Sequence, residues 1–144
     1  MKSLHSKYRI LTDKNLIVEF HKGELTATNF IQFKTALAKD PLFNPNFNFI
    51  ISLTDTTVKA TENNIKEYVN FIQTNISYKG KRKVAIITKT PDQVVSSMLY
   101  KMMHGNPNQI IEIFSTLNNA VKWINTKNLN VNTIKSTLQS LKNQ

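Results

Sequence analysis

The chain has no cysteine, only three glycines and no long apolar run. Without cysteine there is no disulfide, no thiolate metal site and no cysteine nucleophile. No apolar run approaches the ~18 residues of a membrane-spanning helix. The first ten residues, MKSLHSKYRI, lack the apolar segment of a secretory signal. The sequence also contains no Gly-rich phosphate loop, G-x-S-x-G or H-E-x-x-H motif. These absences predict a cytoplasmic globular protein.

Arginine is scarce as well, because Arg9 and Arg82 are the only arginines among 19 basic residues. The formal net charge is nevertheless +10. Such a charge is typical of proteins that bind nucleic acid or an anionic membrane surface. Arginine is the residue best suited to bidentate phosphate recognition, and here lysine takes its place. The charge therefore indicates weak nonspecific attraction to anions and no specific nucleic-acid role.

The 144 residues are 40% hydrophobic and 19% charged, which indicates a globular protein with its own core. Strands are expected at 8–11, 16–21, 47–53, 83–88 and 110–114. Helices are expected after Thr26 or Thr28, after Thr61, and at about 92–104, 117–124 and 131–141. This order predicts an α/β fold with a five-stranded, mostly parallel sheet and an antiparallel first hairpin. Residues 1–125 would form the domain, and 126–144 an additional amphipathic helix.

The predicted strands partly alternate between apolar and polar residues, which is unusual for a sheet covered on both faces. Leu16, Val18, Phe49 and Ile51 are assigned to one face. The other face is assigned a mixed set: Glu19, His21, Asn48, Ser52, Ala85 and Glu112, with Ile17, Ile50 and Ile87. The pattern predicts helices mainly on one face and a partly solvated second face.

Several short motifs, in this order and spacing, resemble the SpoIIAA-like family of small STAS-type domains. They are GELT at 23–26, the Asp40-Pro41 step followed by PNFN at 45–48, IISLTDTTV at 50–58, RKVAIIT at 82–88 and IEIFSTLNNAVKWI at 111–124. The resemblance implies a βα superhelix related in fold to anti-sigma-factor antagonists and to CRAL-TRIO lipid-binding domains. Antagonists of this type carry a phosphoacceptor after the third strand, and residues 55–58 lie at the matching place.

The segment after the third strand is therefore the first candidate site. Thr56, Thr57 and Thr61 offer hydroxyls near a helix N-terminus, where a phosphate is stabilised by free N–H groups, and Asp55 lies directly before Thr56. These residues form either a phosphoacceptor or partner-binding loop, or only the turn and helix cap that Thr and Asp commonly build.

A second candidate is an apolar pocket between the first and third helices, lined by Phe30, Phe33, Met98 and Met102. Methionine is flexible and polarizable, which suits an adaptable ligand pocket or a partner surface. The alternative is ordinary packing of the third helix against the sheet.

Other charged groups are interpreted as solvated. Glu19 and His21 share a strand face and Glu112 is a possible neighbour, but the spacing supplies no third metal ligand and no nucleophile. The basic segment around Arg82 is interpreted as a charged loop in water. The terminal helix, with Val131, Ile134, Leu138 and Leu141 in a stripe, packs on its own sheet or forms a homodimer.

The sequence thus predicts a non-enzymatic, STAS-like binding module without cofactor or metal. Its partner is a regulated protein or, alternatively, a small apolar or lipid-like ligand that the protein carries.

Overall fold

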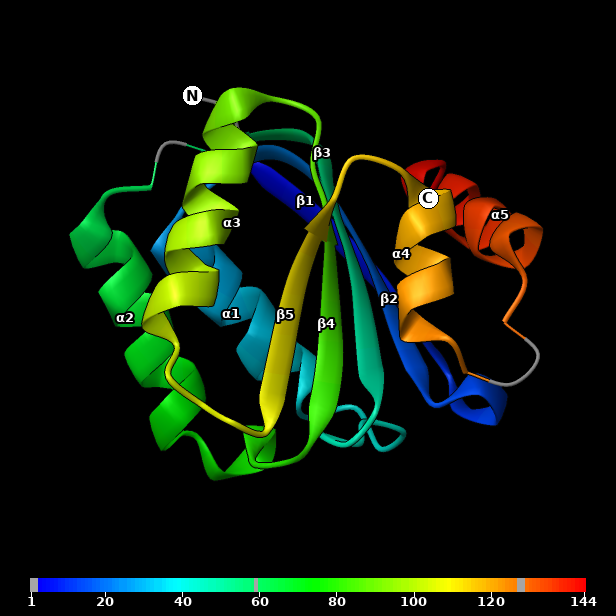
Figure 1. The fold of residues 1–144 in the computed structure, drawn as a ribbon, viewed down its shortest axis with the longest axis horizontal. Helices are drawn as coiled ribbons and strands as arrows, with labels where there is room; N and C mark the ends of the chain where they lie inside the picture. Colours follow the sequence, from blue (N-terminus) through cyan, green and yellow to red (C-terminus); the bar gives the residue numbers. More distant parts are fainter. Residues whose placement is uncertain (1–2, 59, 127–128) are drawn as a thin grey trace.

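The structure is a computed structural model that describes residues 3–58, 60–126 and 129–144. The described residues form five strands and five α-helices, with 3-10 turns at Thr12–Lys14 and Ile76–Tyr78 (Figure 1). In chain order the elements are β1 (Leu4–Leu11), β2 (Leu16–Leu25), α1 (Ala27–Leu37), β3 (Asn48–Val58), α2 (Glu62–Thr74), β4 (Arg82–Ile87), α3 (Pro91–Met103), β5 (Gln109–Phe114), α4 (Leu117–Ile124) and α5 (Val131–Lys142). None of these helices combines the length and hydropathy that crossing a bilayer requires.

The strands form one sheet in the order β1-β2-β3-β4-β5, so every strand neighbours the next one in the chain. β1 and β2 are antiparallel, and the other neighbouring pairs are parallel. Each parallel connection between β2 and β5 contains one helix, as βα units require. The predicted α/β fold, with its antiparallel first pair and mostly parallel sheet, is confirmed.

Helices cover both faces of this sheet. α1, α2 and α3 lie on one face, and α4 and α5 lie on the other (Figure 1). Each face has its own apolar core, and Phe49 is buried in the first core while Ile50 is buried in the second. The expectation of a partly solvated second face is wrong, because α4 and α5 bury it.

The register between β2 and β3 explains why the predicted faces were wrong. Ile17 pairs with Phe49, and Leu16 pairs with Asn48. Ile17 therefore shares a face with Phe49, whereas Leu16 lies on the opposite face, because side chains alternate along a strand. The correction brings Glu19 and His21, two and four residues after Ile17, onto the face beneath α1, α2 and α3.

α5 packs on β1 and β2 of its own chain. Ile134 and Leu141 are almost completely buried in the second core. At the C-terminal end of the helix, Arg9 donates a hydrogen bond to Ser140 and Lys142 forms an ion pair with Asp55 at 3.3 Å. The apolar stripe that a homodimer through this helix would need is used within the chain.

β3 is longer than the sequence predicts. It continues past Leu53 to Val58, and its last residues pair with the end of β2 through a register irregularity between Phe20 and Lys22. Gly23, in the same part of β2, has a φ of 106° and lies close to the start of β1. A Cβ there would lie 2.1 Å from the carbonyl oxygen of Ser3, so only glycine fits. The segment 54–58, expected to be a loop, is therefore strand.

Candidate functional site: a cavity beneath three helices

A cavity of about 210 Å³ lies between the sheet and helices α1, α2 and α3. Its wall is mostly apolar, and its exposed rim lies at the carboxyl ends of β2 and β3, where Glu24 and Thr57 are exposed. The apolar lining residues are Leu25, Ala27, Phe30, Phe49, Ile51, Leu53, Val58, Ala60, Ile65, Ile72, Val84 and Ile86. The polar lining residues are Glu24, Thr26, Lys34, Thr57, Asn64, Tyr68, Tyr78, Arg82, Ser96, Ser97, Tyr100 and Gln109.

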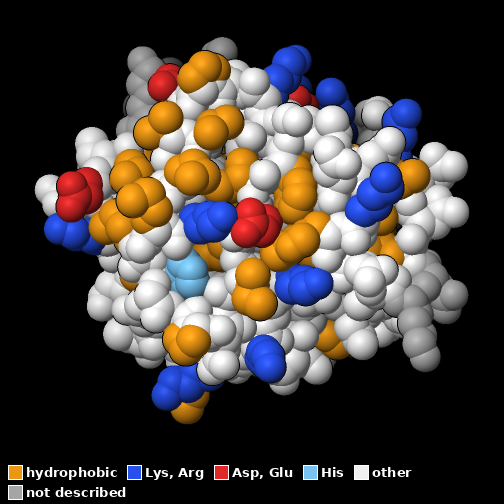
Figure 2. All heavy atoms as spheres, viewed as in Figure 1, with side chains coloured by type: hydrophobic (Ala, Val, Ile, Leu, Met, Phe, Trp, Pro, Cys, Tyr) orange, Lys and Arg blue, Asp and Glu red, His pale blue; other side chains and the backbone are white. Residues whose placement is uncertain are grey.

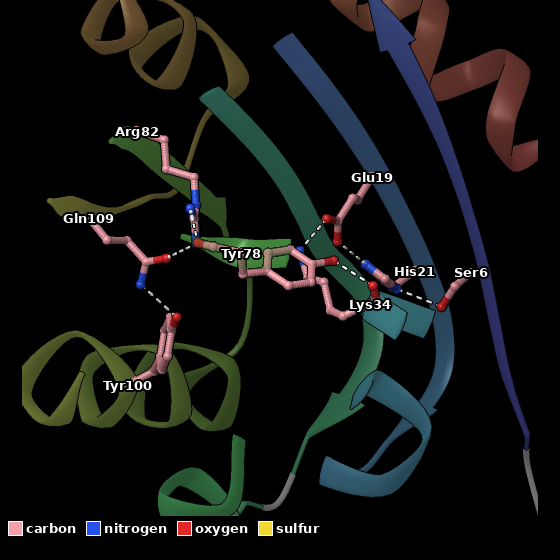
Figure 3. Close-up of polar contacts among 8 residues, drawn as sticks. All are labelled: Ser6, Glu19, His21, Lys34, Tyr78, Arg82, Tyr100 and Gln109. Carbon is pink, nitrogen blue, oxygen red and sulfur yellow. Dashed lines mark hydrogen bonds and ion pairs between the residues drawn. The ribbon is translucent and has the colours of Figure 1, made fainter. Parts of the chain in front are cut away.

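Arg82 supplies a buried charge to the wall of this cavity. The side chain is 5% exposed, so the interpretation of this segment as a solvated basic loop is wrong for Arg82. Its guanidinium donates hydrogen bonds to the carbonyl oxygens of Pro45 and Tyr78, at 3.1 and 2.9 Å. It also donates to Oε1 of Gln109 at 2.8 Å, and the Gln109 amide donates to the Tyr100 hydroxyl at 2.7 Å (Figure 3).

The hydrogen-bond acceptors of Arg82 are all neutral. In the part of the chain that the structure describes, no carboxylate forms an ion pair with Arg82. Burial lowers the pKa of the guanidinium from its usual value, but an arginine in a protein remains protonated. The cavity wall therefore holds a buried positive charge without a protein counter-ion, which is an unfavourable arrangement on its own.

A second polar group lies beside it, on β2 and α1. Glu19 and His21 are fully buried, so the prediction that they lie on a solvated face is wrong. Glu19 accepts hydrogen bonds from the Lys34 ammonium and, at 2.8 Å, from Nε2 of His21; Nδ1 of His21 lies 2.6 Å from the Ser6 hydroxyl (Figure 3). Glu112, expected as a neighbour, instead pairs with Lys101 at 3.0 Å.

The ionisation of Glu19 and Lys34 follows from this burial. Burial alone would raise the pKa of Glu19, but the charge of Lys34 and the hydrogen bond from His21 outweigh it and lower the pKa below 4.5. Burial lowers the pKa of Lys34, and the attraction of Glu19 opposes part of that effect. At neutral pH we therefore describe the two groups as a buried ion pair.

Acid is expected to weaken this fold through Glu19. Because the pKa of Glu19 is lower in the folded chain than its usual value of 4.5, its contribution to stability is complete above pH 4.5 and is lost as the pH falls through the folded value. The titratable groups around Glu19 are His21, Lys34 and, beyond Lys34, Arg82. Urea unfolding between about pH 6 and pH 3 should show a smaller loss of stability in Glu19→Gln than in the natural chain. Equal losses would contradict the assignment.

The third helix turns small polar residues toward the cavity. Gln93, Ser96, Ser97 and Tyr100 are the buried residues of α3. Ser97 is 4% exposed, and its hydroxyl oxygen is buried without a hydrogen-bond partner. Buried hydroxyls are rarely left without a hydrogen-bond partner, which indicates that the Ser97 oxygen has an additional partner in the cavity.

Of the four residues predicted to line an apolar pocket, the structure places only one at the cavity. Phe30 lines the cavity. Phe33 packs against the rings of Tyr8 and His21 and does not line it. Met98 and Met102 lie on the outer side of α3, 41% and 75% exposed, which corrects their predicted place. The buried residues of α3 are mostly polar, so Met98 and Met102 face away from the sheet, whereas Met103 packs against the first core.

The candidate hydroxyls after the third strand have separate environments. Thr56 is 7% exposed and donates a hydrogen bond to the carbonyl oxygen of Leu53 at 2.6 Å. Thr57 is exposed and lies at the rim of the cavity. Thr61 caps α2 in a reciprocal capping box with Asn64, as its position before a helix predicts. Asp55 faces Lys142 of α5.

Gln93 was missed at the sequence level, although it follows Thr90 at the spacing of a capping box. It is fully buried and accepts hydrogen bonds from the backbone N–H groups of Lys89 and Thr90. Its amide donates to the carbonyl oxygen of Thr56 at 2.8 Å. Gln93 thereby fixes the start of α3 to the end of β3, beside the cavity.

Neither polar group assembles a recognisable catalytic centre. Ser6, His21 and Glu19 are linked in series, but neither Ser6 nor His21 lines the cavity, and Glu19 is shared with Lys34. The lining of the cavity, as far as the described residues form it, contains no His, Cys or Asp beside Ser97 that could act as a base. No group of three metal-ligating side chains occurs among residues 3–58, 60–126 and 129–144.

Comparisons with known proteins extend the fold assignment. No family model and no curated protein matches the chain. It is similar to the crystal structure of a DUF3478-family protein with a SpoIIAA-like fold from Shewanella loihica PV-4, with 16% identity, a TM-score of 0.57, and coverage of 86% of this chain and 95% of the other. It is also similar to an anti-sigma factor antagonist from Mycobacterium paratuberculosis, with 15% identity, a TM-score of 0.54, and coverage of 85% and 94%. At such low identity the likeness concerns the fold alone, and the chain has a SpoIIAA-like fold.

Proposed function

We propose that this protein is a non-enzymatic binding module that regulates an acidic partner protein by docking through the outer side of α3. The observation that carries the proposal is an exposed apolar surface on this helix. Val94, Val95, Met98 and Met102 are 39%, 57%, 41% and 75% exposed. We call these four residues the α3 surface.

The α3 surface has the composition of a protein-binding site. Figure 2 shows hydrophobic side chains gathered on the face that carries α3 and β5, with charged side chains among them. Lys101 and Glu112 form an ion pair between these two elements. Exposed clusters of large apolar side chains mark interaction sites, and methionine adapts to the shape of a partner.

Charge favours an acidic partner over a second copy of this chain. Two copies would each bring a net charge of +10, so they repel one another as they approach. The same charge attracts a protein of opposite sign and speeds the encounter. One of the similar structures is named an anti-sigma factor antagonist, which is a name for a protein that acts on another protein. That resemblance supports a regulatory role without identifying the partner.

Matched substitutions test this proposal. Val95 and Leu42 are both 57% exposed, but Leu42 lies in the segment after α1. Quantitative affinity capture should find an acidic protein that the natural chain and Leu42→Glu retain and that Val95→Glu loses by about tenfold or more, equivalent to ~1.4 kcal/mol. The captured protein is then purified, and its dissociation constant is measured with all three chains.

Two outcomes would overturn the proposal. In the first, Val95→Glu and Leu42→Glu bind the purified partner equally, which removes the α3 surface from the interface. In the second, the natural chain forms dimers in sedimentation at micromolar concentration and Val95→Glu remains monomeric. That result would assign the α3 surface to self-association.

A further inference from the structure

We infer that the cavity beneath α1, α2 and α3 binds a small molecule with an apolar body and one carboxylate group. The inference does not depend on the protein partner proposed above. It gives the small-ligand alternative a defined place, a size and a charge. Three observations carry it: the shape of the cavity, the uncompensated charge of Arg82 and the unpartnered hydroxyl of Ser97.

The size and the wall fit an apolar molecule. A dry apolar cavity of roughly 150 Å³ accepts benzene, and this cavity measures about 210 Å³. Side chains such as Ile51, Ile65 and Ile86 line it and bury apolar surface of a guest. Its rim lies at the carboxyl ends of β2 and β3, which is where open α/β sheets bind ligands.

The charge determines the class of ligand. The buried groups around the inner end are the cations Lys34 and Arg82 and a single ionised carboxylate, Glu19. Glu19 pairs with Lys34, which leaves the charge of Arg82 in excess. A guest with one negative charge neutralises this excess, whereas a cation adds to the repulsion and a neutral guest leaves it unchanged.

Hydroxyl groups add further polar partners to the wall of the cavity. The oxygen of Ser97 is buried and has no partner among the described residues. An unsatisfied buried hydroxyl destabilises the fold, so a guest that accepts its hydrogen bond is favoured. Burial raises the pKa of Tyr100 to about 12, and this tyrosine therefore remains a neutral hydroxyl beside Gln109.

Three eight-carbon molecules that differ in charge test the inference: octanoate, 1-octanol and octylammonium. Isothermal titration at pH 7 should show binding of octanoate at least about tenfold tighter than 1-octanol, equivalent to ~1.4 kcal/mol. Octylammonium should bind more weakly than 1-octanol. Equal or stronger binding of 1-octanol or octylammonium, or no binding of any of the three molecules, would overturn the inference.

Two test variants, Ser97→Leu and Arg82→Gln, and one control variant then locate the site. Ser97→Leu adds a side chain on the inward side of α3 and should abolish octanoate binding. Ile76→Leu, at an exposed position that does not line the cavity, should bind octanoate as the natural chain does. Arg82→Gln should bind octanoate and 1-octanol with similar affinity, because it removes the charge that distinguishes them. Unchanged octanoate binding by Ser97→Leu would place the ligand elsewhere and overturn the inference, even where Arg82→Gln fails to fold.

Discussion

Replacing Glu19 with glutamine is expected to lower the free energy of unfolding by about 3–5 kcal/mol, because it leaves a buried cation without its partner. Lys34 is 3% exposed, and Glu19 is the carboxylate with which it pairs. Glutamine keeps the shape of the side chain but removes its charge. Urea unfolding at pH 7 measures the loss.

A more exposed ion pair provides the control. Lys101 and Glu112 have side chains that are 36% and 39% exposed, and solvent screens their interaction. Glu112→Gln should therefore lower the free energy of unfolding by at most ~1 kcal/mol. If Glu19→Gln costs no more than Glu112→Gln, the interior around Lys34 is not as poorly solvated as the structure indicates.

A double variant separates two quantities: what the Glu19–Lys34 pair contributes to the free energy of unfolding, and what is lost when only one partner is removed. Glu19→Leu with Lys34→Met removes both charges and leaves apolar side chains of similar size. Its free energy of unfolding should lie well above that of Glu19→Gln, because no unpaired ammonium remains. The single variants Glu19→Leu and Lys34→Met complete the comparison. If the double variant lost as much stability as these two single variants together, the expectation would be wrong, since residues in direct contact are expected to couple.

The sequence predicted the order of the elements and most of their ends, because these depend on local signals. Thr61 and Thr90 stand before apolar segments at the spacing of helix caps, and both cap the helices that follow them. The faces of β2 could not be assigned in the same way. Leu16, Ile17 and Val18 are consecutive and all buried, so alternation does not say which of them faces α1. A shift of one residue moves every side chain to the opposite face.

The site was harder to predict, because its features depend on tertiary contacts. Arg82 lies in a segment rich in lysine, and nothing in its neighbours shows that it is buried without a carboxylate. α3 did carry a signal. Gln93, Ser96, Ser97 and Tyr100 recur at helical spacing, which marks one side of the helix as polar. The equally regular apolar side was interpreted as the buried one, because the apolar side of a helix usually faces the sheet. In α3 the side that faces the sheet lines a cavity and is mostly polar.

Replacing Thr56 with aspartate is expected to lower the free energy of unfolding by roughly 3 kcal/mol or more, because it introduces a charge into a packed strand end. Thr56 is 7% exposed, and its hydroxyl is already bonded to the carbonyl oxygen of Leu53. The matched control is the next residue. Thr57 is exposed, and Thr57→Asp should change the free energy by at most ~0.5 kcal/mol. Urea unfolding of both variants at pH 7 measures the difference.

The difference between these two threonines decides how a phosphate could act at this end of the sheet. A phosphate brings about −1.5 to −2 charges at neutral pH. On Thr56 it would require the end of β3 to leave the sheet. On Thr57 it would lie at the rim of the cavity and offer its charge to the same interior that we assign to a carboxylate. Thr57→Asp should then weaken octanoate binding while it leaves the fold intact.

Equal stability of Thr56→Asp and Thr57→Asp would show that this segment behaves as a loop, and Thr56 would again be a candidate phosphoacceptor.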